Sequence, residues 1–390
     1  MQLQSSAESS QTAIQTCLAQ LLKQYPKVLQ ALKNTLLESV GEQPWAIALS
    51  GGPDSAALAL CAAALFQAQQ DQIQSTSRSK AKTKQPLLQA PKLFHIHHGL
   101  QSQADGWQAQ VQDLSQLLGL DLIVHRVVVD LKQGQGMEAA ARLARYEALQ
   151  TMAAQANIAK IVLAHHLNDQ AETVLQRLFR GAGVAGMGAM QTVTKQASLV
   201  WLRPWLDLSR EAILEVLVPF REATGWVAVD DPTNLDPELA RGLIRRHLAG
   251  PIEQHWPRWQ QNLARHARQA QQAQNLLLQY GDLLIEQIRL DTQPVESIEP
   301  VSPVNKPPNL DLRGWRALSG DQQALVIRTW LDRAGRRMPT EARLSELCRQ
   351  LNQLHALGHD RHLLWRQSDC EVKCHAGIVS LHVTMDGPLV

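Results

Sequence analysis

Apolar residues in the first two thirds of the chain form short continuous runs separated by helical patterns. The runs are short enough for buried strands and lie at 45–49, 92–97, 121–129, 160–164 and 199–203. Amphipathic stretches typical of helices lie between and after them, near 55–70, 103–118, 137–156, 168–180 and 209–223. This regular alternation predicts an α/β fold, a doubly wound parallel sheet with helices on both faces.

The flanking parts of the chain follow other patterns. Residues 1–40 are rich in Gln and Leu and predict a helical extension ahead of the sheet domain at 41–235. Residues 236–310 form a basic region with a long helix predicted over 251–290, and a proline-rich stretch follows. Residues 311–390 predict a small α+β domain, with helices at 321–334 and 340–356 and strands at 362–366 and 370–382.

Composition excludes several classes of protein. Of the 390 residues 45% are hydrophobic, which is ordinary for a globular protein. The longest apolar run, Ala56 to Phe66, is far shorter than the ~20 residues of a membrane span. The first residues lack the basic and apolar regions of a signal peptide, and the five cysteines are scattered. We therefore expect a cytoplasmic protein without a membrane partner, and no structural metal at Cys370 and Cys374.

A net charge of +2 conceals a local excess of arginine. Between Arg241 and Ala270 there is one acidic residue, Glu253, with several histidines and two tryptophans. The six arginines of this run are Arg241, Arg245, Arg246, Arg258, Arg265 and Arg268. Arginines interleaved with aromatic residues are typical of surfaces that bind a nucleic-acid backbone. A solvated basic helix face is the alternative interpretation.

The first predicted strand runs directly into Ser50, Gly51, Gly52, Pro53, Asp54 and Ser55, and then into an Ala/Leu-rich helix. The two glycines allow close approach of a ligand to the main chain, and Pro53 suits a first helical turn. Free amides and the positive end of a helix dipole, beside two hydroxyls, predict a phosphate site. Asp54 is placed to hold Mg²⁺ among phosphate oxygens. SGGPDS resembles the PP-loop of the ATP pyrophosphatases, which split ATP between its α and β phosphates.

Three later segments carry further candidate residues. His95 and His97 end the second strand and point one way, whereas His98 lies past its end, so the three histidines favour contact with a ligand or RNA over metal binding. Arg142 and Arg145 share a helix face that could meet phosphate or pair with Glu138.

After the fourth strand, Asp169 and Glu172 lie three apart at the start of a helix, beside the expected ATP loop. A capping pair is the plain alternative for these two carboxylates.

The chain carries, in order, a set of motifs similar to those of the tRNA(Ile)-lysidine synthetases. They are SGGPDS, HIHHGL, EAAARLARY, HHLNDQAET with RGAGVAGMGAM, RPWL, DDPTN and RGLIRRHL. The similarity runs from about Ile47 to Pro251, and 311–390 resembles the family's tRNA-binding domain more loosely. It implies adenylation of carbon-2 of the wobble cytidine in a CAU anticodon of tRNA(Ile), followed by attack of free L-lysine and release of AMP. ATP and Mg²⁺ are the implied cofactors, and a homodimer is one assembly compatible with the sequence.

The resemblance also implies roles for individual residues. The loop from Ser50 to Ser55, together with His97, would bind ATP, with Asp54 acting as metal ligand or general base. Asp169 and Glu172 would receive lysine, and Arg142 would meet phosphate in the catalytic centre. Arg241 and Arg245 match the family's motif and would bind the tRNA, and the arginine-rich run itself extends this expectation to Arg246, Arg258 and Arg265.

Two positions depart from the family pattern: Asn168 replaces a common acid and Gly242 a common asparagine. A further C-terminal β-rich domain of the long bacterial forms has no counterpart, so we expect a shorter form or a truncated chain. The nearest rival function is tRNA thiolation, which uses paired cysteines near ATP, whereas the sheet domain after Ser50 has only Cys61. A second rival is an RNA-binding protein with an inactive nucleotide loop, against which Asp54, Asp169 and Glu172 argue.

Overall fold

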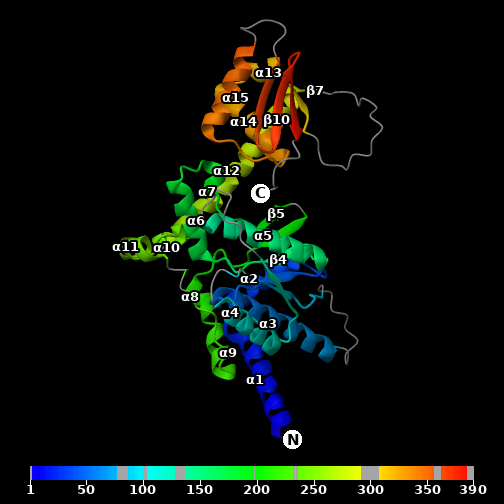
Figure 1. Ribbon diagram of the computed structural model, residues 1–390, viewed down its shortest axis with the longest axis vertical. Helices are drawn as coiled ribbons and strands as arrows, with labels where there is room; N and C mark the ends of the chain where they lie inside the picture. The colour runs from blue at the N-terminus through cyan, green and yellow to red at the C-terminus, as the bar shows by residue number, and fades with distance from the viewer. Residues whose placement is uncertain are drawn as a thin grey trace. The chain divides into compact units, whose positions relative to one another are not determined.

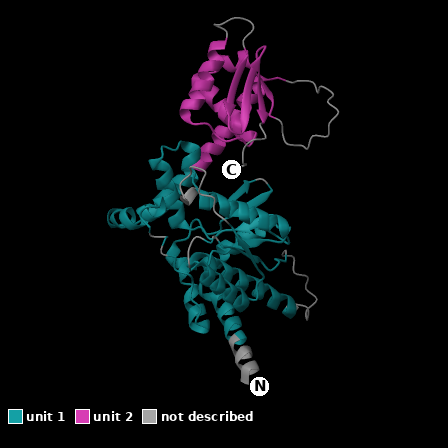
Figure 2. Ribbon diagram, viewed as in Figure 1, with its two compact units in different colours: residues 1–269 teal, residues 270–390 magenta. Residues whose placement is uncertain are grey.

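The chain forms two compact units, residues 1–269 and residues 270–390 (Figure 2). The computed structural model describes residues 2–76, 87–97, 99, 103–127, 137–196, 198–231, 233, 236–290, 307–354 and 362–383 (Figure 1). Among the helices in these ranges, none has the length and apolar character to cross a bilayer.

The core of unit 1 is a six-stranded sheet in the order β3-β2-β1-β4-β6-β5. The five predicted strands are confirmed as parallel neighbours: β1 (Ala46–Ala48), β2 (Lys92–His97), β3 (Leu122–Arg126), β4 (Lys160–Val162) and β6 (Leu199–Leu202). The sixth strand, β5 (Val193–Gln196), was not predicted and pairs antiparallel with β6 at the edge. It carries no apolar run, because an edge strand that is partly in solvent does not need one.

Helices cover both faces of this sheet, as the alternation of strands and helices predicted. Ile47 and Leu93 point to the face covered by α3 (Pro53–Thr76) and α4 (Ala104–Leu118). Ala46 and Phe94, one position away, face α5 (Met137–Gln155). The predicted N-terminal helices are α1 (Gln2–Gln24) and α2 (Pro26–Ser39), and their apolar sides join the core beside α3.

The strand order places a topological switch point between β1 and β4. The chain leaves β1 toward β2 and β3, then returns to pair β4 with the other side of β1. Ligands of doubly wound sheets bind in the crevice at the carboxyl ends of the strands flanking such a point. A ligand site is therefore expected at the segments that follow β1 and β4.

The remaining helices of unit 1 are mostly short. They are α6 (Leu167–Phe179), α7 (Val184–Met187), α8 (Arg210–Leu214), α9 (Leu217–Thr224), α10 (Ala240–Leu243), a π-helical turn η3 (Ile244–Leu248) and α11 (Ala249–His255). The prediction of one helix over 251–290 is wrong in one respect, because the chain breaks after α11 and resumes as α12 (Trp259–Ile288). Pro257 causes the break, since it lacks an N–H and disfavours the helical conformation at Trp256.

Unit 2 packs helices on an antiparallel sheet of order β7-β8-β11-β10-β9. Its strands are β7 (Arg289–Leu290), β8 (Asn309–Asp311), β9 (Leu363–Gln367), β10 (Cys370–His375) and β11 (Ile378–Val383), and its further helices are α13 (Leu312–Ala317), α14 (Gly320–Arg333) and α15 (Glu341–Gln353). The single strand predicted over 370–382 is a hairpin, in which Ala376 and Gly377 both have positive φ. Two residues of positive φ are the conformation of a tight two-residue hairpin turn.

Candidate functional site

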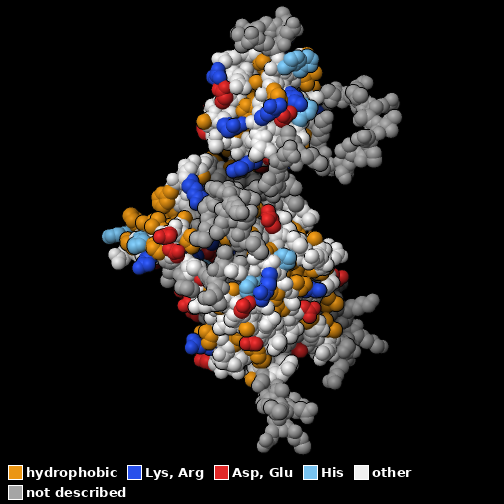
Figure 3. All heavy atoms as spheres, in the orientation of Figure 1, with side chains coloured by type: hydrophobic (Ala, Val, Ile, Leu, Met, Phe, Trp, Pro, Cys, Tyr) orange, Lys and Arg blue, Asp and Glu red, His pale blue; other side chains and the backbone are white. Residues whose placement is uncertain are grey.

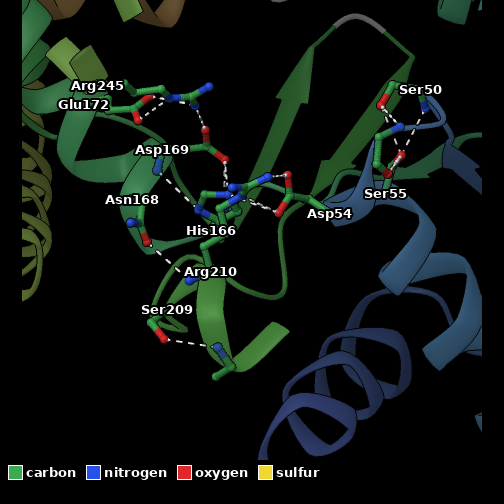
Figure 4. A network of polar contacts seen from close by, with 12 residues as sticks. Ser50, Asp54, Ser55, His166, Asn168, Asp169, Glu172, Ser209, Arg210 and Arg245 are labelled. Atoms are coloured by element: carbon green, nitrogen blue, oxygen red, sulfur yellow. Dashed lines mark hydrogen bonds and ion pairs between the residues drawn. The ribbon is translucent and has the colours of Figure 1, made fainter. Parts of the chain in front are cut away.

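The loop after β1 is a compact turn tied together by its two serines (Figure 4). Ser55 Oγ lies 3.0 Å from Ser50 Oγ and accepts the Ser50 N–H at 3.2 Å. Gly51 has φ +91°, and a Cβ there would lie 3.0 Å from Val111 Cγ2. Only glycine fits this position, so the backbone of the predicted phosphate loop is preset by its sequence.

Asp54, in the first turn of α3, is held by a residue that the sequence analysis did not single out. Arg210 donates from Nε to Asp54 Oδ1 at 3.0 Å and from Nη2 to Oδ2 at 3.4 Å. His166 Nε2 lies 3.5 Å from the same Oδ1. The only local signals for Arg210 are a Ser209 N-cap and a place just beyond the last parallel strand. Its partner could not be read from the sequence, because 156 positions separate it from Asp54.

Asp169 is both a cap and a charged site residue, so the two interpretations of this position are compatible. The His166 N–H donates to Asp169 Oδ2 at 3.2 Å, and the Asp169 N–H donates to His166 Nδ1 at 3.4 Å. The other carboxylate oxygen, Oδ1, faces Arg245 at 3.3 Å and Arg241 at 3.6 Å. Burial alone would raise the pKa of Asp169, but His166, His165 and the two arginines hold it below its usual value.

Glu172, one turn further along α6, is buried and paired with Arg245. Arg245 donates from Nε to Oε1 at 2.7 Å and from Nη2 to Oε2 at 3.0 Å, which is the fork geometry of a strong charge-assisted pair. Burial alone would lower the pKa of Arg245, but the hydrogen bond and charge of Glu172 raise it above its usual value. The carboxylate pair therefore already holds a cationic side chain.

The structure divides the predicted tRNA-binding arginines into two groups. Arg241 and Arg245 point into unit 1 toward Asp169, and Arg241 also reaches Thr173 Oγ1 at 3.5 Å. Arg246, Arg258 and Arg265 are exposed. Arg268 is exposed and paired with Asp207. The first group is thus placed to act on the carboxylates, and the second is accessible to a large ligand.

The other predicted site residues make separate contacts. His97 Nε2 is 3.1 Å from Asp105 Oδ1, which also accepts from Arg126. Arg142 is exposed, and its guanidinium lies 5.0 Å above the Tyr146 ring. The side chain of Glu138, the alternative partner of Arg142, lies outside the described residues, as does His98.

The two positions that depart from the family pattern have visible roles. Asn168 Oδ1 accepts the Arg210 N–H at 3.2 Å, so a neutral amide supports the residue that holds Asp54. A Cβ at Gly242 would lie 1.8 Å from the Asp236 backbone oxygen. Glycine at 242 therefore lets the chain at Asp236 lie directly against α10.

Comparison of the sequence with known proteins identifies the family of this chain. A model of the PP-loop domain, which binds ATP, matches residues 22–251, and one of the TilS substrate binding domain matches residues 310–379. A tRNA(Ile)-lysidine synthase of Bordetella parapertussis is 46% identical over 334 residues, covering 86% of this chain and 88% of that protein. The chain belongs to the tRNA(Ile)-lysidine synthase family.

More distant members of the tRNA(Ile)-lysidine synthase family are similar over most of the chain. The Pseudomonas aeruginosa protein is 35% identical, covering 85% of this chain and 67% of its own. The Ralstonia nicotianae protein is 36% identical and is covered over 58% of its length. Among solved structures, the U34-tRNA thiolase NcsA from Methanococcus maripaludis aligns with a TM-score of 0.47 and 14% identity, covering 63% of this chain and 78% of that one.

The cysteines separate this chain from the rival thiolation function. Cys61 is fully buried in α3, and burial raises the pKa of its thiol. Cys17, the other cysteine of unit 1, is buried in α1. Neither thiol is presented to the crevice as a reactive thiolate would have to be.

Proposed function

We propose that this enzyme activates the wobble cytidine of a CAU-anticodon tRNA(Ile) with ATP and then joins free L-lysine to carbon-2, in the cytoplasm. One observation carries the proposal. Asp54, behind the phosphate loop, is linked through His166 to Asp169, and Asp169 through Arg245 to Glu172. Asp54, proposed to serve ATP, and the two carboxylates proposed to receive lysine thus belong to one polar network (Figure 4).

The loop residues serve the first half-reaction. The backbone at Gly51 and the start of α3 offers hydrogen-bond donors to the phosphates of ATP, while the hydroxyls of Ser50 and Ser55 bond to each other and hold the loop in shape. Such donors stabilise charge that develops on the departing pyrophosphate. The product is a cytidine whose carbon-2 oxygen carries AMP, which is a far better leaving group than the original oxygen.

Asp54 fits a magnesium site of the kind that is completed by substrate. Within the described residues there is no cluster of three His, Cys, Asp or Glu side chains that could form a metal cage. Mg²⁺ on nucleotides commonly uses one or two carboxylates plus phosphate oxygens and water, so a single carboxylate beside the loop is sufficient. When bound, the ion would neutralise phosphate charge, and Asp54 would hold it while Arg210 keeps the carboxylate in place.

Asp169 and Glu172 serve the second half-reaction. Their carboxylates hold the guanidinium of Arg245, which supports their use as a site for the ammonium groups of lysine. The attacking amine must lose a proton, and a neighbouring carboxylate can accept it. As the carbon–nitrogen bond forms at carbon-2, the bond to the adenylate oxygen breaks and AMP leaves.

The reaction can be tested directly with transcripts. The protein is incubated with ATP, Mg²⁺, labelled lysine and tRNA transcripts bearing CAU, one for isoleucine and one for methionine. We expect ATP-dependent lysine label on the isoleucine transcript only. Label on neither transcript, with ATP and tRNA both bound, would refute the proposed function.

A further inference from the structure

Two tryptophans three residues apart lie in opposite environments. Trp259 is 6% exposed and packs with Ala171, Leu175 and Ile244 in a small apolar cluster. Trp256 is 63% exposed. Tryptophan has the largest aromatic surface of any residue, and leaving it in water forgoes its burial energy. Core packing therefore accounts for Trp259 and leaves Trp256 unexplained.

The backbone around Trp256 is held in place on both sides. Its N–H donates to the Ile252 carbonyl at 2.8 Å, and its carbonyl accepts the Trp259 N–H at 2.9 Å. Pro257 follows, and the His255 ring lies edge-on with its centroid 5.9 Å from that of Trp256. The backbone that carries the indole is thus held at the break between α11 and α12, so little backbone ordering is needed on binding a ligand.

The surroundings of Trp256 are cationic. Arg246, Arg258 and Arg265 are exposed on the same stretch, and Glu253 is its one acidic residue. Figure 3 shows hydrophobic, histidine and basic side chains over α10 and α11, with some acidic side chains beside them. Arg245, at the other end of this helical segment, reaches Glu172.

We propose that Trp256 is a stacking platform for an unpaired nucleobase of the bound tRNA. An aromatic face takes a base of any sequence, while neighbouring arginines take the phosphates on either side. The excess of basic over acidic residues on this stretch favours a nucleic-acid backbone over a protein partner. This inference rests on the proposed function, and it assigns to Trp256 a contact separate from the phosphate contacts of the arginines.

The test measures tRNA affinity as a function of salt for Trp256→Ala, Trp256→Leu and Trp256→Phe. Loss of one stacked base costs ~1–3 kcal/mol, so Trp256→Ala should weaken binding about tenfold with the salt slope unchanged. Leu should weaken it similarly, because it is apolar but cannot stack, and Phe should stay within about threefold of wild type. Val218→Ala, an exposed apolar truncation on α9, is the matched control and should bind normally.

The outcomes separate this inference from the proposed function. Wild-type affinity in Trp256→Ala, or full affinity in Trp256→Leu, would overturn the stacking role while lysidine formation by the wild type continues. A fall in the salt slope of Trp256→Ala would also overturn it, since the lost contact would then be to phosphate. Unchanged tRNA affinity with a changed oligomeric state would assign the indole to protein contact instead.

Discussion

The ion pairs of the two units differ in what surrounds them. In unit 1 the side chains of Glu172 and Asp169 are only 5% and 10% exposed where they meet Arg245. In unit 2 the pairs Arg333–Asp282 and Arg328–Glu341 lie on exposed helix surfaces. Exposed pairs contribute little to stability, whereas buried charges are costly and strongly destabilising when one partner is removed. The burial of the unit 1 cluster therefore supports the proposed role of these carboxylates in the reaction.

The largest effect is expected at Asp54. Asp54→Ala should lower AMP formation about 10³-fold, because it removes several kcal/mol of charge stabilisation at the phosphates. tRNA affinity should stay within about twofold of wild type, since the exposed arginines are unchanged. Release of AMP and tRNA retention on filters measure the two quantities. Asp113→Asn, an exposed carboxylate on α4, is the control, and near-normal turnover in Asp54→Ala contradicts the site assignment.

Glu172→Gln and Asp169→Asn should separate the two half-reactions. Each removes a charged acceptor worth ~1.5–3 kcal/mol, so lysine incorporation should fall about ten- to a hundredfold. Cytidine adenylation should fall much less, and adenylated tRNA should accumulate. Chromatography of nuclease-digested tRNA distinguishes the two products, and thermal unfolding checks that the unpaired Arg245 does not disrupt the fold. Equal losses in both steps would assign the carboxylates to ATP or metal.

Arg210 should act on adenylation through Asp54. Arg210→Ala should slow it roughly tenfold, about the worth of one lost charge-assisted hydrogen bond. Arg210→Lys should recover only part of the rate, because an ammonium cannot reproduce the two-point contact. The lysine step, started from adenylated tRNA made by the wild type, should be normal in both variants. A slowed lysine step would place Arg210 in the second half-reaction.

Replacing Arg246, Arg258 and Arg265 together by Ala should weaken tRNA binding without affecting ATP. Each phosphate contact contributes about 0.9 to the slope of log K against log salt for duplexes, so the slope should fall by up to about three. Titration of tRNA binding over a range of salt gives this value. An unaltered slope would mean that these arginines form only a solvated face.

The smallest effect is expected at an exposed pair of unit 2. Asp282→Asn removes the partner of Arg333 and should change the free energy of unfolding by no more than about 1 kcal/mol. Chemical unfolding measures this change. A loss as large as that of a buried pair would contradict the distinction between the two units.

The sequence predicted the parts of the site that depend on local pattern. Strand ends, the glycine loop and the helix carrying Asp169 and Glu172 follow from runs of residues, and the strand order brings them together. The role of Arg210 and the inward direction of Arg245 could not be predicted, because their partners are distant in the sequence. Arg210 lies 156 positions from Asp54, and Arg245 lies 73 positions from Glu172. The contrast between Trp256 and Trp259 likewise depends on the break at Pro257 and on packing against Ile244, which no periodicity reveals.

We propose that one polar network at the β1–β4 switch point carries out two consecutive half-reactions. The most direct test is a single turnover with ATP labelled in its α-phosphate, first without lysine and then with lysine added. We expect label on the wobble cytidine before lysine is present, and release of that label as AMP in step with lysine incorporation. Labelled AMP appearing only with lysine, with none trapped on the tRNA, would contradict it.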